Sequence, residues 1–169
     1  MKFEQKQSPE KFNIKKLTVE DADKYREIRL KGLETDPQSF GSTYEEEAIK
    51  DEEYWKERLL NPKRTFYVAE EGDKFISTAT SNNYDENIWS IQAVYTLPEF
   101  RGKGLSETLI RKLIDEAGQK GAKLITLGVN QKNSNAISLY EKLGFKIVRE
   151  KIKEAKDGDR DYFHMEKIL

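Results

Sequence analysis

Cysteine is absent from the 169 residues of this chain, and histidine occurs only once, as His164. Without cysteine there is no disulfide framework, no thiolate zinc site and no cysteine nucleophile. A serine–histidine–aspartate triad would have to use His164, and a metal site of several histidines is excluded within one chain. His164 lies in the run Tyr162–Met165, which is typical of a strand. We therefore expect a structural or surface histidine and no metal site.

The chain also lacks an excess of either charge. Lys and Arg together number 30 and Asp and Glu number 31, so the formal net charge is -1. Domains that bind nucleic acid are usually strongly basic, so we expect no nucleic-acid partner. No apolar run is long enough to span a membrane, and residues 1–10 lack the apolar core of a signal peptide. These absences predict a cytoplasmic protein that does not act on a membrane.

The length suits a single domain, which we place at residues 12–169 after a flexible N-terminal lead-in at 1–11. Hydrophobic periodicity predicts helices at 19–33, 45–60, 105–118 and 133–144. It predicts strands at 12–17, 65–70, 75–81, 88–96, 123–129, 145–153 and 161–168, with Asp157-Gly158 in the last connection. This order indicates an α/β (α+β) fold, with a mixed central sheet of about seven strands and about four flanking helices.

The most informative stretch is a basic glycine-bearing loop, Arg101-Gly102-Lys103-Gly104, between the strand 88–96 and the helix that follows. Pro98 ends the strand because it has no N–H to give to a neighbouring strand. The first N–H groups of a helix point outward at the positive end of its dipole, and glycines let a ligand approach the backbone. The loop therefore indicates a phosphate or pyrophosphate site, and the alternative is a tight turn with its basic residues in solvent.

Two common phosphate motifs do not fit this loop. A Walker A sequence cannot be aligned with residues 101–106, and a dinucleotide fingerprint would need glycine where Glu107 stands. A kinase-like enzyme would also need acidic magnesium ligands beside the loop, and the sequence shows no motif for them.

The loop instead resembles Arg/Gln-x-x-Gly-x-Gly/Ala, the pyrophosphate loop of the GNAT superfamily of acyl-CoA-dependent N-acetyltransferases. Arg101, Gly104 and Ser106 fill its fixed positions, and Ser106 departs from the usual Gly or Ala. A second GNAT signature, Asn-x-x-Ala-x-x-x-Tyr-x-x-x-Gly-Phe, is matched at every fixed position from Asn133 to Phe145. The resemblance covers residues 65–153.

This resemblance implies the GNAT fold, in which the fourth strand, here 88–96, carries a bulge and splays away from the fifth, here 123–129. Acetyl-CoA would be the co-substrate, with its pantetheine arm in the gap and its pyrophosphate on the loop. The cofactor-binding residues implied are Val94, Tyr95, Arg101, Gly102, Lys103, Gly104, Leu105, Ser106, Asn133, Ala136 and Tyr140. For Asn133 a simple helix-capping role is an equal alternative.

The resemblance also implies direct attack of an amine on the thioester in a ternary complex. Tyr140 matches the tyrosine that serves as general acid for the leaving thiolate, and its alternative role is packing. The general base stays open, because the strand 88–96 holds no carboxylate and Gln92 cannot act as a base. The proton of the amine could be removed by a chain of water molecules, by a carboxylate of the run Glu45–Glu53, or by a carboxylate of the turn Asp85-Glu86.

The sequence also leaves several classes of amine as the acceptor of the acetyl group. The run Glu45–Glu53 reads either as a solvated helix face or as an acidic lip that attracts cationic amines. A small amine or polyamine is slightly favoured over an antibiotic amine or a protein N-terminus. The alternative function is a non-catalytic acyl-CoA sensor or partner-binding module on the same fold. A homodimer through the final strands is expected from the habit of the family alone.

Overall fold

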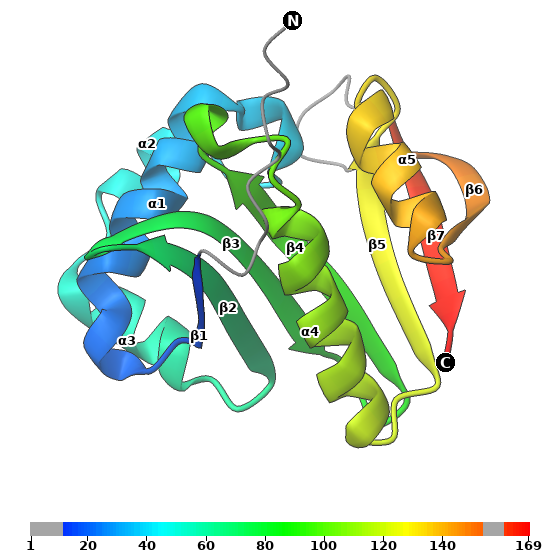
Figure 1. Cartoon of the computed structure of the whole chain (residues 1–169), viewed down its shortest axis with the longest axis horizontal. Helices are drawn as coiled ribbons and strands as arrows, with labels where there is room; N and C mark the ends of the chain where they lie inside the picture. Colours follow the sequence, from blue (N-terminus) through cyan, green and yellow to red (C-terminus); the bar gives the residue numbers. More distant parts are fainter. Residues whose placement is uncertain (1–11, 154–160) are drawn as a thin grey trace, which may run out of the picture.

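A computed structural model describes residues 12–153 and 161–169 of the chain. Across these ranges seven strands form one sheet in the order β1-β2-β3-β4-β5-β7-β6 (Figure 1). Their bounds are β1 Asn13–Lys16, β2 Arg64–Glu71, β3 Lys74–Asn83, β4 Ile88–Thr96, β5 Leu124–Asn130, β6 Lys146–Lys153 and β7 Asp161–Ile168. Among the described strands, only β4 and β5 pair in parallel. The predicted mixed sheet is confirmed, and every strand bound agrees with its prediction within two residues.

Helices cover both faces of this sheet (Figure 1). Their bounds in the described residues are α1 Ala22–Thr35, α2 Tyr44–Ala48, α3 Glu52–Leu60, α4 Leu105–Gln119 and α5 Ser134–Lys142. Side chains of α1 and α3 share one hydrophobic core with β2 and β3. Side chains of α4 and α5 share a second core with β5 and β7 on the opposite face. The predictions for residues 1–11 and for the turn at Asp157-Gly158 lie outside the described residues.

The prediction of a single helix at 45–60 is wrong, and this raises the helix count from about four to five in the described part of the chain. Helix α2 ends at Ala48, and Asp51 starts α3 by accepting the backbone N–H of Tyr54 at 2.9 Å. An aspartate in this capping position stabilises a new helix start more than it stabilises the middle of a helix. Asp51 belongs to the acidic run of the sequence, which hid its role as a cap.

Helix α1 buries one side of its surface, and Arg29 belongs to that side with its whole side chain. Its Nε and Nη2 donate to the two carboxylate oxygens of Glu47 at 2.9 and 2.6 Å, and its guanidinium lies 4.7 Å from the ring centre of Phe40. This ion pair fixes α2 against α1. Glu47 is therefore not part of a solvated face or of an acidic lip.

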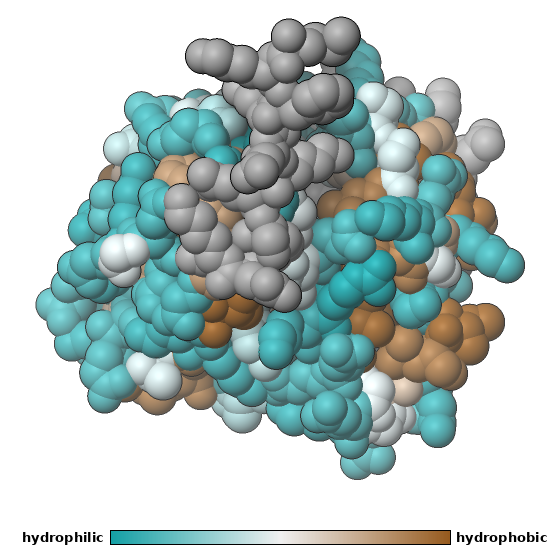
Figure 2. Space-filling model, viewed as in Figure 1, coloured by the Kyte–Doolittle hydropathy of each residue, from teal (hydrophilic) through white to brown (hydrophobic). Residues whose placement is uncertain are grey.

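The last two strands at one side of the sheet, β7 and the edge strand β6, carry much of the exposed apolar surface. Figure 2 shows a largely hydrophilic face on which hydrophobic residues gather near the C-terminal strands. The large apolar side chains exposed there are Ile147, Val148, Ile168 and Leu169. In the residues described, no helix combines the length and the hydrophobicity that crossing a membrane requires.

A buried carboxylate attaches α4 to the sheet at the end remote from the glycine loop. Glu116 accepts hydrogen bonds from Lys16 at 2.6 Å, from Lys120 at 2.7 Å and from the Tyr67 hydroxyl at 3.0 Å. Burial alone would raise the pKa of Glu116, but these bonds outweigh burial and lower it to about 2. Glu116 thus joins α4 to β1 and β2 through an interaction that requires its charged form.

We expect Glu116→Gln to lower the free energy of unfolding by about 2–3 kcal/mol near pH 7, allowing for screening of the exposed lysines. Because the folded-state pKa is lowered, the stabilisation is present above the ordinary carboxyl pKa of 4.5 and is lost as the pH falls through about 2. Urea unfolding at several pH values measures this. The control is Asp115→Asn, an exposed neighbour on the same helix. An equal loss in both variants would contradict the prediction.

Candidate functional site

A cavity of about 590 Å³ opens where β4 and β5 part. The parallel pairing of these strands covers only Ile88 to Ser90 against Leu124 to Thr126. Beyond it, β4 carries a bulge: Tyr95 pairs with Thr78 and Gln92 with Thr80, so Ala93 and Val94 face the single residue Ala79. Ala93 has a φ of 52°, which is rare for a residue with a side chain. The predicted bulge and splay are both confirmed.

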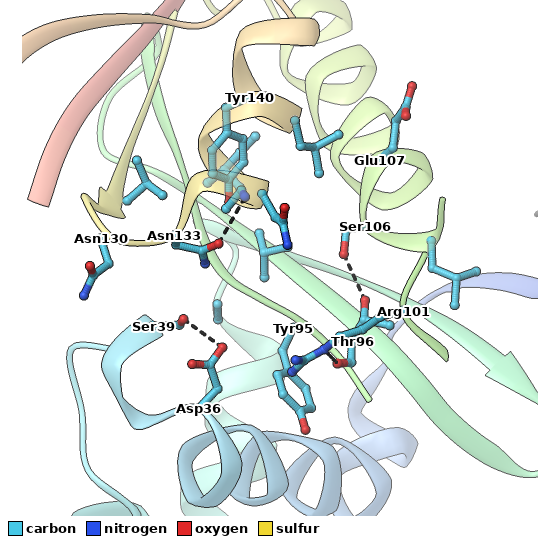
Figure 3. A pocket seen from close by; sticks show the side chains of 18 of the residues that line it. Asp36, Ser39, Tyr95, Thr96, Arg101, Ser106, Glu107, Asn130, Asn133 and Tyr140 are labelled. Carbon is cyan, nitrogen blue, oxygen red and sulfur yellow. Dashed lines mark hydrogen bonds between the residues drawn. The ribbon is translucent and has the colours of Figure 1, made fainter. Parts of the chain in front are cut away.

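The structure brings almost all of the predicted cofactor-binding residues to this cavity. The residues that line it include Val94, Tyr95, Arg101, Gly102, Gly104, Leu105, Ser106, Asn133, Ala136 and Tyr140. Lys103 is not among the lining residues. Figure 3 shows Tyr140 and Asn133 on one side of the cavity, Arg101, Thr96 and Ser106 on another, and Asp36 with Ser39 opposite Tyr140. His164 lies away from it, on β7, hydrogen-bonded to Glu166 at 3.0 Å.

The glycines of the basic loop have the conformations that the sequence argument requires. Gly102 and Gly104 have φ values of 75° and 78°, and Gly104 is the N-cap of α4. This left-handed backbone favours glycine, and residues 104–106 at the start of the 15-residue helix line the cavity. The side chain of Leu105 is buried in the core, so only its backbone can meet a ligand.

A chain of hydroxyl groups ties this helix start to the sheet. The Ser77 hydroxyl donates to the carbonyl oxygen of Tyr95 at 3.1 Å. Because the Ser77 hydroxyl proton is used in this bond, the Ser77 oxygen accepts the hydroxyl proton of Thr96 at 2.7 Å. The Thr96 oxygen in turn accepts the hydroxyl proton of Ser106 at 2.9 Å. The hydroxyl that distinguishes Ser106 from glycine or alanine is therefore directed to the sheet. Its backbone N–H remains in the helix start, where a phosphate would lie.

The side chains of Arg101 and Tyr95 pack against each other beside this loop. The Nε of Arg101 donates to the carbonyl oxygen of Thr96 at 3.0 Å, and its guanidinium lies 5.9 Å from the ring centre of Tyr95. The Tyr95 hydroxyl bonds Thr35 of α1 at 2.7 Å. The side chain of Tyr95 is thus buried in the core, so a ligand in the gap would contact the backbone of this residue.

Helix α5 presents the residues of the second motif. The side-chain oxygen of Asn133 accepts the N–H of Ala136 at 3.1 Å, so Asn133 caps the helix and also lines the cavity. Tyr140 is buried, with its ring packed edge-on against Phe145 at 5.9 Å between ring centres. Burial raises the pKa of Tyr140 to about 12, so its phenol keeps its proton at any working pH.

The cavity holds a carboxylate that the sequence argument missed. Asp36, directly after α1, lines it, and in the sequence this residue falls in the connection that follows the predicted helix 19–33. Of the carboxylates that we did consider, none in 45–53 lines the cavity, and Asp85 caps its own turn by accepting the N–H groups of Asn87 and Ile88. A carboxylate beside a helix end carries no sequence signal of its own, so the fold was needed to find it.

Comparison with known proteins agrees with this geometry. The model of the Acetyltransferase (GNAT) family matches residues 29–145. The chain belongs to this family. The solved structure of yncA, an acetyltransferase from Salmonella typhimurium with its cofactor acetyl-CoA, has a TM-score of 0.77 at 21% identity, and the match covers 94% of each chain. At this identity the likeness shows the shared fold.

Two relatives resemble this chain in sequence over stretches of different length. An uncharacterized N-acetyltransferase of Methanocaldococcus jannaschii is 26% identical over 140 residues, which cover 79% of this chain and 60% of that protein. The L-amino acid N-acyltransferase MnaT of Escherichia coli is 36% identical over 55 residues, or 32% of each chain. This GNAT chain spans about 60% of the length of the first of these relatives.

The loop geometry predicts different effects for two substitutions at Ser106. Ser106→Ala removes a hydroxyl that bonds Thr96, so we expect stability to fall by about 1 kcal/mol and acetyl-CoA affinity to change little. Ser106→Pro removes the N–H of the second residue of α4, in the first helical turn, where proline is better tolerated than in the interior, so we expect the Kd for acetyl-CoA to rise about 10- to 100-fold. Isothermal titration calorimetry measures both. Pantetheine, which lacks the pyrophosphate, is the control ligand, and an equal loss of pantetheine affinity would contradict the prediction.

Proposed function

We propose that this GNAT protein transfers the acetyl group of acetyl-CoA to a primary amine by direct attack in a ternary complex. The observation that carries the proposal is the cavity itself. The gap between β4 and β5 runs from the N-terminus of α4, with its basic glycine loop, to the buried phenol of Tyr140. One end suits a pyrophosphate and the other suits a thioester.

The donor groups on the cavity wall fit acetyl-CoA. The first N–H groups of α4 and the guanidinium of Arg101 suit the pyrophosphate, because both carry positive charge or partial charge. The backbone around Val94 and Tyr95 lies beyond the last β4–β5 pair, where it has no neighbouring strand on that side. A pantetheine arm would hydrogen-bond there as an added strand does. When bound, acetyl-CoA would supply the activated acetyl group.

Tyr140 is proposed as the general acid that protonates the leaving thiolate. A phenol of pKa about 12 would give its proton to a thiolate of ordinary pKa only against about 5 kcal/mol. The same burial disfavours the thiolate and raises the pKa of the thiol, which narrows this difference. Because the phenol stays protonated throughout the working range, ionisation of Tyr140 should not limit the rate below about pH 11.

A small amine is the acceptor class that we favour, and the polyamine idea loses its motivation. That idea depended on the acidic run Glu45–Glu53, but Glu47 is buried against Arg29 and the other acidic residues of the run lie away from the cavity. Partial similarity to an L-amino acid N-acyltransferase supports including amino acids among the candidates. A homodimer and a cytoplasmic location stay predictions from the sequence.

Release of the CoA thiol from acetyl-CoA, measured over a panel of amines, tests the function. The panel contains amino acids, alkylamines, arylamines, spermidine, aminoglycosides and short peptides. Release with one class of amine supports the transferase and names its acceptor. Tight acetyl-CoA binding without release for any class would favour the alternative function, a non-catalytic acyl-CoA sensor.

We expect Tyr140→Phe to lower kcat by about 100-fold or more, the usual scale for losing a general acid, while the Kd for acetyl-CoA changes little. Steady-state kinetics and calorimetry separate the two quantities. The matched control is Tyr67→Phe, which removes a phenol whose pKa is also raised to about 12 but which lies outside the cavity. Unchanged kcat in Tyr140→Phe would remove this residue from the mechanism.

A further inference from the structure

The cavity has a further wall, opposite Tyr140, to which none of the sequence motifs contributes. It is formed by the corner between α1 and the short 3-10 turn Pro37–Ser39, which faces β5 and β7. The Tyr162 hydroxyl of β7 donates to the carbonyl oxygen of Gln38 at 3.0 Å and so holds this corner across the open gap. Asp36 and Ser39 line the cavity from the corner (Figure 3).

Asp36 is held firmly in this position. Its N–H donates to the carbonyl oxygen of Gly32 at 2.9 Å, and its carbonyl oxygen accepts the N–H of Ser39 at 3.0 Å. The Ser39 hydroxyl donates to Oδ2 of the carboxylate at 2.8 Å. Among the residues that the structure describes, no cation pairs with Asp36 and no group bonds Oδ1. The carboxylate is thus oriented through one oxygen, and the other is available to a ligand.

Glu107, the other carboxylate that lines the cavity, has both of its oxygens paired with cations. Glu107 on α4 pairs with Lys142 at 2.7 Å and with Arg111 at 2.9 Å. Hydrogen bonds from Lys142 and then Arg111 lower the pKa of Glu107 below its usual range. Its charge is already neutralised by two cations, which leaves it little attraction for an ammonium group or for a proton.

We propose that Asp36 is the acceptor site of this transferase: it binds the ammonium group of the incoming primary amine and takes its proton. The inference rests on the proposed function and supplies the general base that the strand β4 lacks. Figure 3 places Asp36 opposite Tyr140 across the cavity, so the groups that would accept and donate protons lie on either side of the space where the thioester would react.

The proton balance follows from this placement. The acceptor enters as R-NH3+, and Oδ1 of Asp36 removes one proton to leave a neutral nitrogen with a free electron pair. That pair forms the new C–N bond at the acetyl carbon while the C–S bond breaks, and the sulfur takes a proton from Tyr140. The nitrogen loses its second proton to solvent, Tyr140 is reprotonated from solvent, and Asp36 gives the proton that it took to solvent before the next turnover. The sum is an amide, a thiol and one released proton.

The test compares Asp36→Asn with the wild-type protein on two kinds of acceptor. An alkylamine is almost wholly protonated at pH 7, since its pKa is near ~10, and it needs a base. An arylamine is neutral at pH 7 and needs none before attack. We expect Asp36→Asn to lower kcat/KM for the alkylamine by about 100-fold or more, and to change it for the arylamine by much less.

Turnover of the arylamine and the Kd for acetyl-CoA show whether the variant is folded with an intact cofactor site. Glu34→Gln, which neutralises an exposed carboxylate on the same helix, controls for a general loss of negative charge and is expected to affect both acceptors little. Ser39→Ala keeps the carboxylate but frees its orientation, and we expect an intermediate loss that is again confined to the alkylamine.

Two results would overturn the inference. Full alkylamine activity in Asp36→Asn would exclude Asp36 as the base, and equal losses for both acceptors would assign it a structural role. Failure of the proposed function is a separate result, because the wild-type protein would then release no CoA with either amine.

Discussion

The site depends on the early end of the parallel pairing between β4 and β5. Only three register pairs join these strands, after which the bulge at Ala93 and Val94 turns β4 away. In a continuous sheet the backbone groups of β4 would bond β5, and no cavity would exist between them. The unusual φ of Ala93 is the local cost of this geometry, of order 1–3 kcal/mol, and the surrounding core maintains it. The strained bulge therefore accompanies the gap between the two strands.

Buried polar contacts then position the groups around the gap. The hydroxyl chain from Ser106 to Ser77 sets the start of α4 against the sheet, and the bonds of Asp36 and Tyr162 set the opposite corner. The ion pair of Arg29 and Glu47 fixes α2 close to that corner. Each contact lies on a different element, so the site is a product of tertiary structure, although its glycine loop is local.

Much of this arrangement could be predicted from the sequence, and the reasons differ by residue. The glycine loop and the helix of Tyr140 are local motifs, and the strands have strong periodicity, so both were found. Glu47 and Asp51 were misread, and the buried pairing of Arg29 was not found, because a charged residue in an acidic or amphipathic run shows no sign of its partner. Asp36 was missed for the same reason: its role follows from the side of the cavity on which α1 ends, and no spacing in the sequence records that.

The buried side chains of α4 have a further consequence for the two halves of the sheet. Leu109 and Leu113 belong to the core that also contains Leu127 and Met165 from the strands beyond the gap. Ile91 of β4 belongs to the same core, so it joins the two halves past the point where their strand pairing ends. Helix α4 therefore acts as a tie across the gap, and smaller side chains in place of Leu109 and Leu113 would loosen the walls of the cavity from places that do not line it.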